Sequence, residues 1–526
     1  MKHLKYLLLA ALPFAFAACD KEDEPDFVPA LEFATDKLSA DAGGGILSVD
    51  VKADMPYEVV MPQEAAWIKL EGEAQPEAAT LSFEVEKNTA ATARTAAVVI
   101  RASEGITPAD TLHITQSGLD DAADITAEFD PAFAALLQEK GYIGNSQHIT
   151  PADVKDITKL DVSGEYEDYK DGKGLTSLKG IEYFTALTYL DCEFNQLTAL
   201  DISRHTALEY LDCGENPLTT LDVSQNTALT VLSCYANQLT ELDISHNTAL
   251  TELYCCYNRL GSLNVNQCAA LEYLDCRNSQ LTALDVSHNT ALTFLLCYEN
   301  QLTALDVSQN IALDTLLCYE NQLTALDVSR NTALEVLSCY KNQLTALDVS
   351  QNTALTTLGC GKNQLTALDV SRNTALTSLG CAENQLTALD VSQNTALEYL
   401  SCYGNQLTAL DVSRNSVLTE LYCSGNQLGS LDVSKNTALT ELACSINRLP
   451  SLDVSQNTAL TRLACSQNQL PSLDVSRNTA LVELLCSGNP GRVGIFEVFV
   501  WPGSGLKAQD ESWDYEGQTV NVKYSE

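Results

Sequence analysis

The sequence predicts a mainly β protein whose largest part is a solenoid, a stack of short coils that each contact only their neighbours. The first observation is a cysteine that recurs every 21 residues, fifteen times in succession, from Cys192 to Cys486. The second is a set of short alternating polar and apolar runs over residues 31–118, which is typical of an immunoglobulin-like β-sandwich. The third is a pair of helix-start signals between these two regions. Because a fixed period of this length indicates a repeat architecture, we expect 21-residue coils over residues 187–489.

The composition excludes one class of partner. The chain has 30 Lys and Arg residues against 70 Asp and Glu residues, a formal net charge of -40 at pH 7. Basic surfaces bind phosphate backbones, so we expect no nucleic-acid partner. The same charge disfavours adsorption to anionic lipid, which leaves a covalent or hydrophobic attachment as the route to a membrane.

The first residues indicate export. A charged start precedes an apolar run, 6–16, that is too short to span a membrane, and small residues then lead to Cys19. This arrangement resembles the lipobox of bacterial lipoproteins, although Phe16 stands where an aliphatic residue is usual, and it implies a lipid on the Cys19 thiol. The acidic run after Cys19 resembles the signal that sends Bacteroidetes lipoproteins to the outer face of the outer membrane; the alternative is a solvated spacer. We therefore expect a signal peptide over 1–18, an acidic tether over 19–30 and a lipid-anchored protein of the outer membrane, exposed at the cell surface.

Residues 31–118 carry a second resemblance. Runs such as 46–51 and 95–100 alternate in polarity and are separated by turn-rich stretches, as in a β-sandwich. A resemblance to the BACON domain is carried by Trp67, Phe83, Asn88, Arg94 and the closing segment 112–118. That family was named for suspected carbohydrate binding, and many of its members look like spacers. We favour a spacer here, with glycan binding as the alternative.

Both ends of the array have candidate caps. Asp130 before Pro131, and Thr150 before Pro151, are helix-start signals within the linker and cap segment 119–186. An uncovered end coil would expose its apolar interior to water, so we expect these helices to seal the first coil. The segment 490–526 contains two apolar alternating runs, which predict a C-terminal β cap.

The cysteine column is expected to face inward. In each strand the cysteine shares a side with the preceding leucine, and a thiol behaves as a small hydrophobe. A disulfide ladder is the alternative for an exported chain, but in-register strands about 4.8 Å apart exceed the roughly 3.8 Å between Cβ atoms that a disulfide prefers. Equal rungs also offer no tetrahedral metal site, so we expect no metal. Cys256 and Cys268 lie off the column, and Cys256 is expected to face outward as a reactive thiol.

Two further columns have a structural interpretation. Asparagines recur from Asn195 to Asn489, and from Asn226 to Asn478, where they are expected to pair with the backbone of the turns. Aspartates recur in the Leu-Asp-Val-Ser half of each coil, where like charges one strand apart would repel. We expect hydrogen bonds and solvent to offset this repulsion, with bridging calcium as the alternative.

The pattern L-x-x-L-x-C-x-x-N-Q-L resembles the leucine-rich repeat family, and the Asn-Gln-Leu-Thr run is similar to that of internalin-like members. The resemblance covers residues 187–489. It implies a sheet whose exposed strand positions bind proteins. Because the second half of each coil is too short for a helix, we expect low curvature and a second extended segment on the back.

Variation among the coils concentrates three before, one before and one after each cysteine, the positions that share the outward side of the strand. Aromatic residues there are typical of contact surfaces because they bury much area at little cost in entropy. The alternative is that stacked tyrosines only stabilise the sheet. The candidate ligand-binding residues are Phe294, Leu296, Tyr298, Leu317, Tyr319, Tyr340, Tyr399 and Tyr403.

These features predict a non-enzymatic binding or adhesion protein that docks a protein partner on the tyrosine-rich sheet. Capture of surface glycans is the alternative function. An enzyme is the least favoured class, because His205, His246 and His288 occupy repeat corners without a partnered nucleophile. No cofactor is expected.

Overall fold

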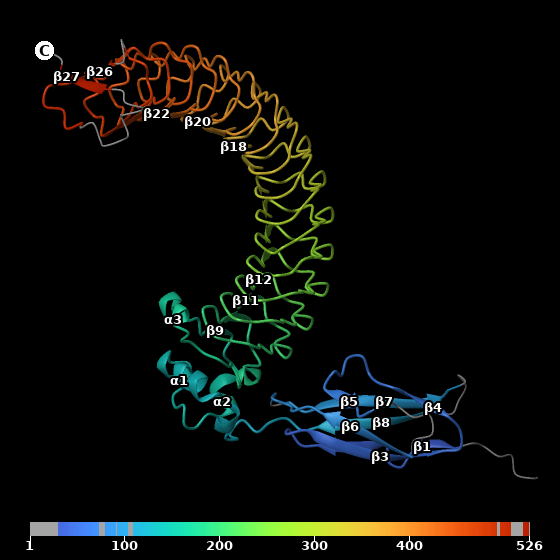
Figure 1. Ribbon diagram of the computed structural model, residues 1–526. Coiled ribbons are helices and arrows are strands. Elements are labelled where there is room, and N and C mark those ends of the chain that lie inside the picture. The colour runs from blue at the N-terminus through green and yellow to red at the C-terminus, as the bar shows by residue number, and fades with distance from the viewer. Residues whose placement is uncertain are drawn as a thin grey trace, which may run out of the picture. The chain divides into compact units, whose positions relative to one another are not determined.

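The computed structural model describes residues 30–72, 79–90, 92–103, 109–491, 495–506 and 519–524, and the chain forms two compact units that divide after Asp120 (Figure 1). The expected signal peptide, Cys19 and the acidic tether up to residue 29 lie outside the described residues. Among the described residues, no helix has the length and apolar content that a membrane span requires.

The first unit is a sandwich of two four-stranded sheets, ordered β1-β3-β6-β5 and β2-β8-β7-β4. Phe83, Val98 and Leu112 are fully buried between the sheets, because alternate residues of each strand face the core. This confirms the predicted β-sandwich. Its strands are β1 (Leu31–Phe33), β2 (Lys37–Ala40), β3 (Gly45–Ala53), β4 (Tyr57–Val60), β5 (Ile68–Leu70), β6 (Thr80–Val85), β7 (Arg94–Ala102) and β8 (Ala109–Gln116).

The residues that carry the BACON resemblance hold this sandwich together. The Arg94 guanidinium lies 4.4 Å from the centre of the Trp67 ring and donates a hydrogen bond of 2.8 Å to the Gln116 side chain. The Asn88 amide donates to the carbonyls of Thr92 and Ser117, at 2.9 and 3.1 Å. These side chains therefore fix the ends of strands.

The second unit begins with short helices. These are η1 (Thr126–Glu128), α1 (Pro131–Glu139), α2 (Pro151–Val154), α3 (Tyr166–Lys170) and η2 (Ile181–Tyr183). The Asp130 carboxylate accepts from the backbone of Ala132 and Phe133, at 2.8 and 3.2 Å, and so caps α1 as expected. Phe133 is fully buried and packs near Phe129 and Phe184, which closes the apolar interior of the first coil.

The array is built on a sixteen-stranded parallel sheet that runs in order from β9 to β25, with β24 left out (Figure 1). Each strand is three residues long and pairs in register with the next, so that Leu295 faces Leu316 and Leu316 faces Leu337. The sheet lies on the inner side of a gradual bend. Its strands are β9 (Lys159–Asp161), β10 (Tyr189–Asp191), β11 (Tyr210–Asp212), β12 (Val231–Ser233), β13 (Glu252–Tyr254), β14 (Tyr273–Asp275), β15 (Phe294–Leu296), β16 (Thr315–Leu317), β17 (Val336–Ser338), β18 (Thr357–Gly359), β19 (Ser378–Gly380), β20 (Tyr399–Ser401), β21 (Glu420–Tyr422), β22 (Glu441–Ala443), β23 (Arg462–Ala464) and β25 (Glu483–Leu485).

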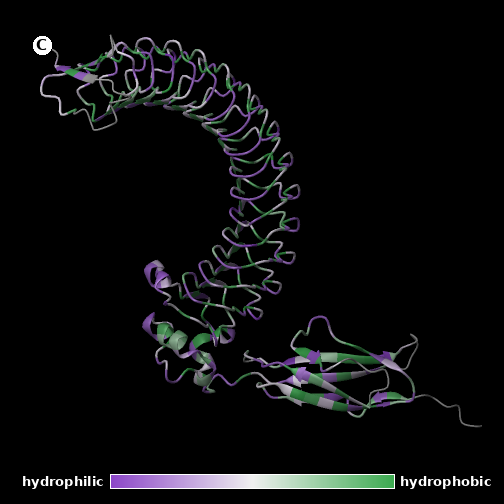
Figure 2. Cartoon of the chain, viewed as in Figure 1, coloured by the Kyte–Doolittle hydropathy of each residue, from purple (hydrophilic) through white to green (hydrophobic). Residues whose placement is uncertain are grey.

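The interior of each coil is apolar and closely packed. In one coil Leu295, Cys297, Leu302 and Val307 are all fully buried. Hydrophobic and hydrophilic residues alternate along the coils (Figure 2). The hydrophobic residues of each coil are thereby buried against those of the neighbouring coils. The described cysteines are all free thiols and buried. The leucine-rich solenoid and its inward cysteine column are therefore confirmed.

The expectation for Cys256 is wrong. Its side chain is 2% exposed, because Asp275 and Arg277 from the next coil cover it. Burial raises the pKa of the Cys256 thiol to about 12, so the thiolate that would react is disfavoured.

The last coils end in a second, smaller parallel sheet. The back strand β24 (Ser472–Asp474) pairs with β26 (Ile495–Val500), and β26 pairs with β27 (Thr519–Tyr524). Phe496, Val498 and Val500 are buried. Among the described residues of the array, β24 is the one strand in the back half of a coil; in the other coils the Leu-Asp-Val segment does not pair as a strand, and a turn begins at the serine that follows it.

Candidate functional site

The surface that varies from coil to coil is the exposed side of the sixteen-stranded sheet, which we call the sheet face. In β18 the central Leu358 is buried, whereas Thr357 and Gly359 on either side of it are half-buried. Since side chains alternate across a strand, the positions three before, one before and one after each cysteine share the sheet face.

Aromatic rings gather on neighbouring strands of this face. Tyr298 and Tyr319 stack with their centres 4.1 Å apart and their planes 15° apart. Tyr273 lies between Tyr254 and Phe294, with ring centres 4.8 and 5.7 Å away. Such pairs stabilise adjacent strands and also present a broad contact surface.

The candidate ligand-binding residues differ in how much of each side chain is exposed to solvent. The side chains of Phe294 and Tyr403 are the open ones, at 38% and 37% exposed, whereas Tyr298 is 7% exposed. The half-buried candidates are Leu296, Leu317, Tyr319, Tyr340 and Tyr399. Strand pairing places Leu296 beside Leu317, and the stacked rings of Tyr298 and Tyr319 lie next to them. Tyr399 and Tyr403 belong to a separate group near β20.

Tyr298 is buried because Arg277 covers it. The Arg277 guanidinium donates to the Tyr298 hydroxyl and lies 5.4 Å from the ring centres of both Tyr298 and Tyr257. It also pairs with the buried carboxylate of Asp275, at 3.3 Å, whose pKa is raised by burial. Neither Arg277 nor Tyr257 is among the residues predicted from the sequence. The available signal was that Arg277 is the only basic residue directly after any of the fifteen column cysteines.

Carboxylates accompany the tyrosines. The hydroxyl of Tyr254 donates to the Glu252 carboxylate at 2.8 Å, and that of Tyr235 donates to Glu193 at 2.9 Å. The Tyr422 hydroxyl lies 2.9 Å from a carboxylate oxygen of Glu420 and 2.7 Å from one of Glu441. The sheet face is therefore both aromatic and acidic.

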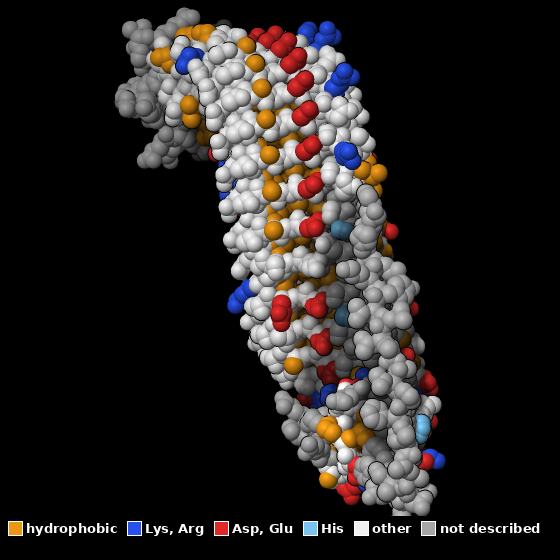
Figure 3. Space-filling model, turned by 90° about the vertical axis from the view of Figure 1, so that its right-hand side faces the viewer, with side chains coloured by type: hydrophobic (Ala, Val, Ile, Leu, Met, Phe, Trp, Pro, Cys, Tyr) orange, Lys and Arg blue, Asp and Glu red, His pale blue; other side chains and the backbone are white. Residues whose placement is uncertain are grey.

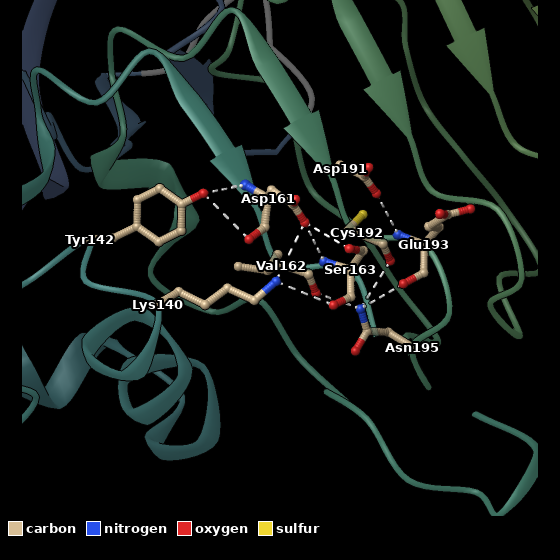
Figure 4. A network of polar contacts seen from close by, with 9 residues as sticks. All are labelled: Lys140, Tyr142, Asp161, Val162, Ser163, Asp191, Cys192, Glu193 and Asn195. Atoms are coloured by element: carbon tan, nitrogen blue, oxygen red, sulfur yellow. Dashed lines mark hydrogen bonds and ion pairs between the residues drawn. The ribbon is translucent and has the colours of Figure 1, made fainter. Parts of the chain in front are cut away.

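Three aspartates lie side by side on the first strands of the array. Asp161, Asp191 and Asp212 pair in register across β9, β10 and β11. Burial raises the pKa of Asp191 to about 6 and that of Asp212 to about 7. Figure 4 shows Lys140 reaching toward this row, where its ammonium lies 3.5 Å from the Asp161 carboxylate.

The aspartate column lies on the opposite surface, formed by the Leu-Asp-Val-Ser segments, which we call the back face. Figure 3 shows it as a file of acidic side chains along the array. In the coils that carry this aspartate, the carboxylate accepts from the backbone of the serine two residues later, as between Asp348 and Ser350 at 2.9 Å, and in one coil Asn264 and Asn266 take these positions. These bonds lower the pKa of Asp348 and match the expected hydrogen-bonded explanation. Among the described residues, no group of three or more His, Cys, Asp or Glu side chains is placed to hold a metal ion.

Comparison with protein families matches residues 57–117 to BACON, described as "Putative binding domain, N-terminal". No curated protein matches the chain.

Solved structures match the array. The functional domain of InlJ from Listeria monocytogenes, which includes a cysteine ladder, is 38% identical, with a TM-score of 0.60 over 67% of this chain and 76% of that one. The leucine-rich repeat protein LIC12759 from Leptospira interrogans is 29% identical, with a TM-score of 0.57 over 65% of this chain and 92% of that one. An internalin, inlF, from Listeria monocytogenes shares the fold at 24% identity, with a TM-score of 0.53 over 69% and 97%.

Proposed function

This chain belongs to the internalin-type leucine-rich repeat proteins, and we propose that it is a non-enzymatic binding and adhesion protein of the bacterial surface. The proposed partner is a protein that docks on the sheet face. One observation carries the proposal: the coils differ from one another chiefly on that face, where aromatic side chains such as Phe294 and Tyr403 reach solvent. Aromatic anchors of this kind dominate the energy of many interfaces.

The three histidines at the corners of the array support a non-enzymatic function. His205 is buried, with its Nε2 atom 3.0 Å from the Ile181 carbonyl, which is a structural contact. The imidazoles of His246 and His288 are exposed at turns, each 3.2 Å from the hydroxyl of the preceding serine. A general base needs a neighbour that orients it and a nucleophile within reach, and adjacent residues on an exposed turn do not provide a shielded site.

We propose lipid attachment at Cys19 as the means of surface retention. The support is the small-residue run before Cys19 and the acidic run after it. The Cys19→Ala variant is expected to leave the membrane fraction and to take up no labelled fatty acid. Retention of the variant in the membrane would contradict the anchor and leave the binding proposal standing.

Glycan binding is the second candidate function. It is supported by the BACON match over 57–117 and by the exposed rings of Tyr257, Phe294 and Tyr403, whose faces suit stacking on sugars. A glycan array probed with the full chain tests it. Signal from one glycan class that is lost with Tyr403→Ala would favour this function.

The protein-binding proposal is tested by affinity capture with matched variants. The double variant Phe294→Ala and Tyr403→Ala removes two open rings from the sheet face. The control Ile311→Ala removes an apolar side chain that is 61% exposed but lies in the turn after Asn310, outside the sheet. A protein partner retained by the wild type and the control, and lost with the double variant, is expected. Equal capture by all three would remove the sheet face from the proposal.

A further inference from the structure

Three basic side chains on the sheet face lie against tyrosine rings, whereas a fourth, Arg462, pairs with the carboxylates of Glu441 and Glu483. The Lys159 ammonium lies 4.2 Å from the centre of the Tyr189 ring, and the Lys362 ammonium lies 5.5 Å from that of Tyr340. Arg277 lies over two tyrosine rings, as described above. A cation near the face of an aromatic ring is attracted by the negative charge of the ring face.

In two of these three arrangements a carboxylate also lies close to the cation. Arg277 pairs with Asp275 at 3.3 Å, and Lys362 lies 3.5 Å from the Glu383 carboxylate. The chain thus uses a tyrosine ring and a nearby carboxylate together as a receptor for a basic side chain. Ring and carboxylate contribute by different physical means, so their attractions add on the same cation.

The same combination recurs at Glu252 and Glu420, although at Tyr422 the second carboxylate, Glu441, already pairs with Arg462 at 3.6 Å. Glu252 bonds to Tyr254, and Glu420 bonds to Tyr422, through the tyrosine hydroxyls at 2.8 and 2.9 Å. Tyr273 and Phe294 flank the first pair, and Tyr399 lies 5.6 Å from Tyr422 in the second. Within the described residues, neither Glu252 nor Glu420 forms an ion pair with a Lys or Arg side chain.

We infer that the sheet face binds a basic polypeptide segment, whose lysine or arginine side chains enter these tyrosine–carboxylate pairs. The inference rests on the proposed protein-binding function and names the chemistry of the partner. The net charge of -40 attracts such a segment from a distance, and the pairs fix it in place.

General attraction to an acidic protein must be separated from binding at the pairs, and the chain offers a matched control. The double variant Glu252→Gln and Glu420→Gln removes two charges from the sheet face and keeps an acceptor for each tyrosine hydroxyl. The control Asp327→Asn and Asp348→Asn removes two charges from the back face and keeps the acceptor for each serine N–H. Both proteins therefore have the same net charge.

The experiment measures the affinity of the purified full chain for a lysine oligomer, an arginine oligomer and a neutral peptide of equal length. Wild type is expected to bind the two basic oligomers and not the neutral one. The sheet-face variant is expected to lose about tenfold in affinity, and the back-face control is expected to remain within about twofold of wild type. Equal losses in both variants, or no binding by wild type, would overturn the inference.

The rings have their own test. Replacing Tyr254 and Tyr422 by Leu removes the aromatic faces and is expected to weaken oligomer binding, whereas replacing them by Phe keeps the rings and most of the affinity. Because these side chains are half-buried, thermal unfolding of each variant confirms that the fold is retained. If affinity capture yields a protein partner on the sheet face while basic oligomers fail to bind, the proposed function stands and this inference fails.

Discussion

The two asparagine columns use one residue type for two different tasks. Asn342 accepts from the backbone of Leu323, at 2.9 Å, and donates to the carbonyls of Cys318 and Cys339, at 3.0 and 3.1 Å. Asn352, in the other column, only donates, to the carbonyls of Val328 and Asn331, at 2.9 and 2.8 Å. Both satisfy backbone groups that the tight turns leave unpaired, which is why a buried amide recurs at each corner.

Cys268 interrupts the second column and weakens it. Its thiol contacts the carbonyls of Ile244 and Asn247 at 3.8 and 3.6 Å, in place of two amide hydrogen bonds. We expect Cys268→Asn to raise the free energy of unfolding by about 1 kcal/mol, since each restored bond contributes about 0.5–1.5 kcal/mol before the cost of ordering the side chain. The reciprocal change Asn352→Cys should lower it by a similar amount. Urea-induced unfolding measures both, and an unchanged midpoint in both proteins would contradict the assignment.

Burial makes the charged form of Asp212 unfavourable in the fold. Burial raises its pKa to about 7 in the folded chain from an ordinary value of 3.8. Folding therefore favours the protonated carboxyl, and this contribution to stability is complete below the unfolded pKa and lost as pH rises through about 7. Asp191, with a pKa of about 6, acts in the same direction.

The Asp212→Asn variant tests whether ionisation of Asp212 lowers the stability of the fold. The new amide oxygen can still accept from the backbone of Gly214, which bonds to Asp212 at 2.9 Å. We expect a gain of about 2 kcal/mol in the free energy of unfolding at about pH 8, discounted for the remaining contact with water, and little change at about pH 4. Thermal unfolding at both pH values measures it. A gain of equal size at the two values would exclude ionisation as its cause.

At the scale of elements, each end coil of the array has a neighbouring coil on one side only, and a cap supplies the contacts that are missing on the other side. The back strand β24 pairs with β26, which buries Phe496 and Val498 against the last coils. An inner coil has a neighbour on both sides, whereas the last one has only this cap.

Removal of the residues after 491 therefore has a local effect. We expect backbone amides of β23 and β25 to exchange with solvent faster in the truncated chain, while those of β15 and β16 keep their protection. Hydrogen exchange followed by mass spectrometry resolves these segments. Uniform acceleration along the array would show that its coils unfold as one unit.

The same elements show what can be read from the sequence. The cysteine period located the strands β10 to β23, because each inward thiol follows a strand in a fixed way. The caps of α1 and α2 were visible in Asp130 and Thr150. Helix α3 was missed, since Glu165 precedes it without a side-chain hydrogen bond to its first turn.

The candidate site was less predictable because exposure depends on neighbouring coils. Tyr298 and Phe294 both occupy outward positions of one coil, yet Arg277 from the preceding coil covers only the first. Cys256 is hidden by the same neighbour. A reading of each coil by itself identifies which positions face outward, but the side chains 21 residues away decide which of them reach solvent.

At the scale of the whole molecule, charge is the dominant feature. The chain carries a formal charge of -40, and both the sheet face and the back face contribute carboxylates. Net charge of this size repels itself within a compact fold. Hydrogen bonds to serine ease this locally, as at Asp348, but they leave the long-range repulsion in place.

Salt is therefore expected to stabilise the protein. At neutral pH the thermal unfolding temperature should rise as sodium chloride increases from about 10 mM to about 300 mM, because the screening length falls from roughly 30 Å to below 10 Å. Calorimetry at constant pH measures the change. Potassium chloride at equal ionic strength serves as the control, and a response confined to one salt would indicate specific ion binding in place of screening.

The in-register pairing of nearly identical coils also affects how such a protein changes over generations. Because successive coils pair in the same register, the end of one coil fits the start of any other coil. Unequal recombination between the encoding DNA repeats can thus lengthen or shorten the array in whole coils while both caps are kept. The length of the array and the number of its contact positions can therefore change from one generation to the next while the fold is kept.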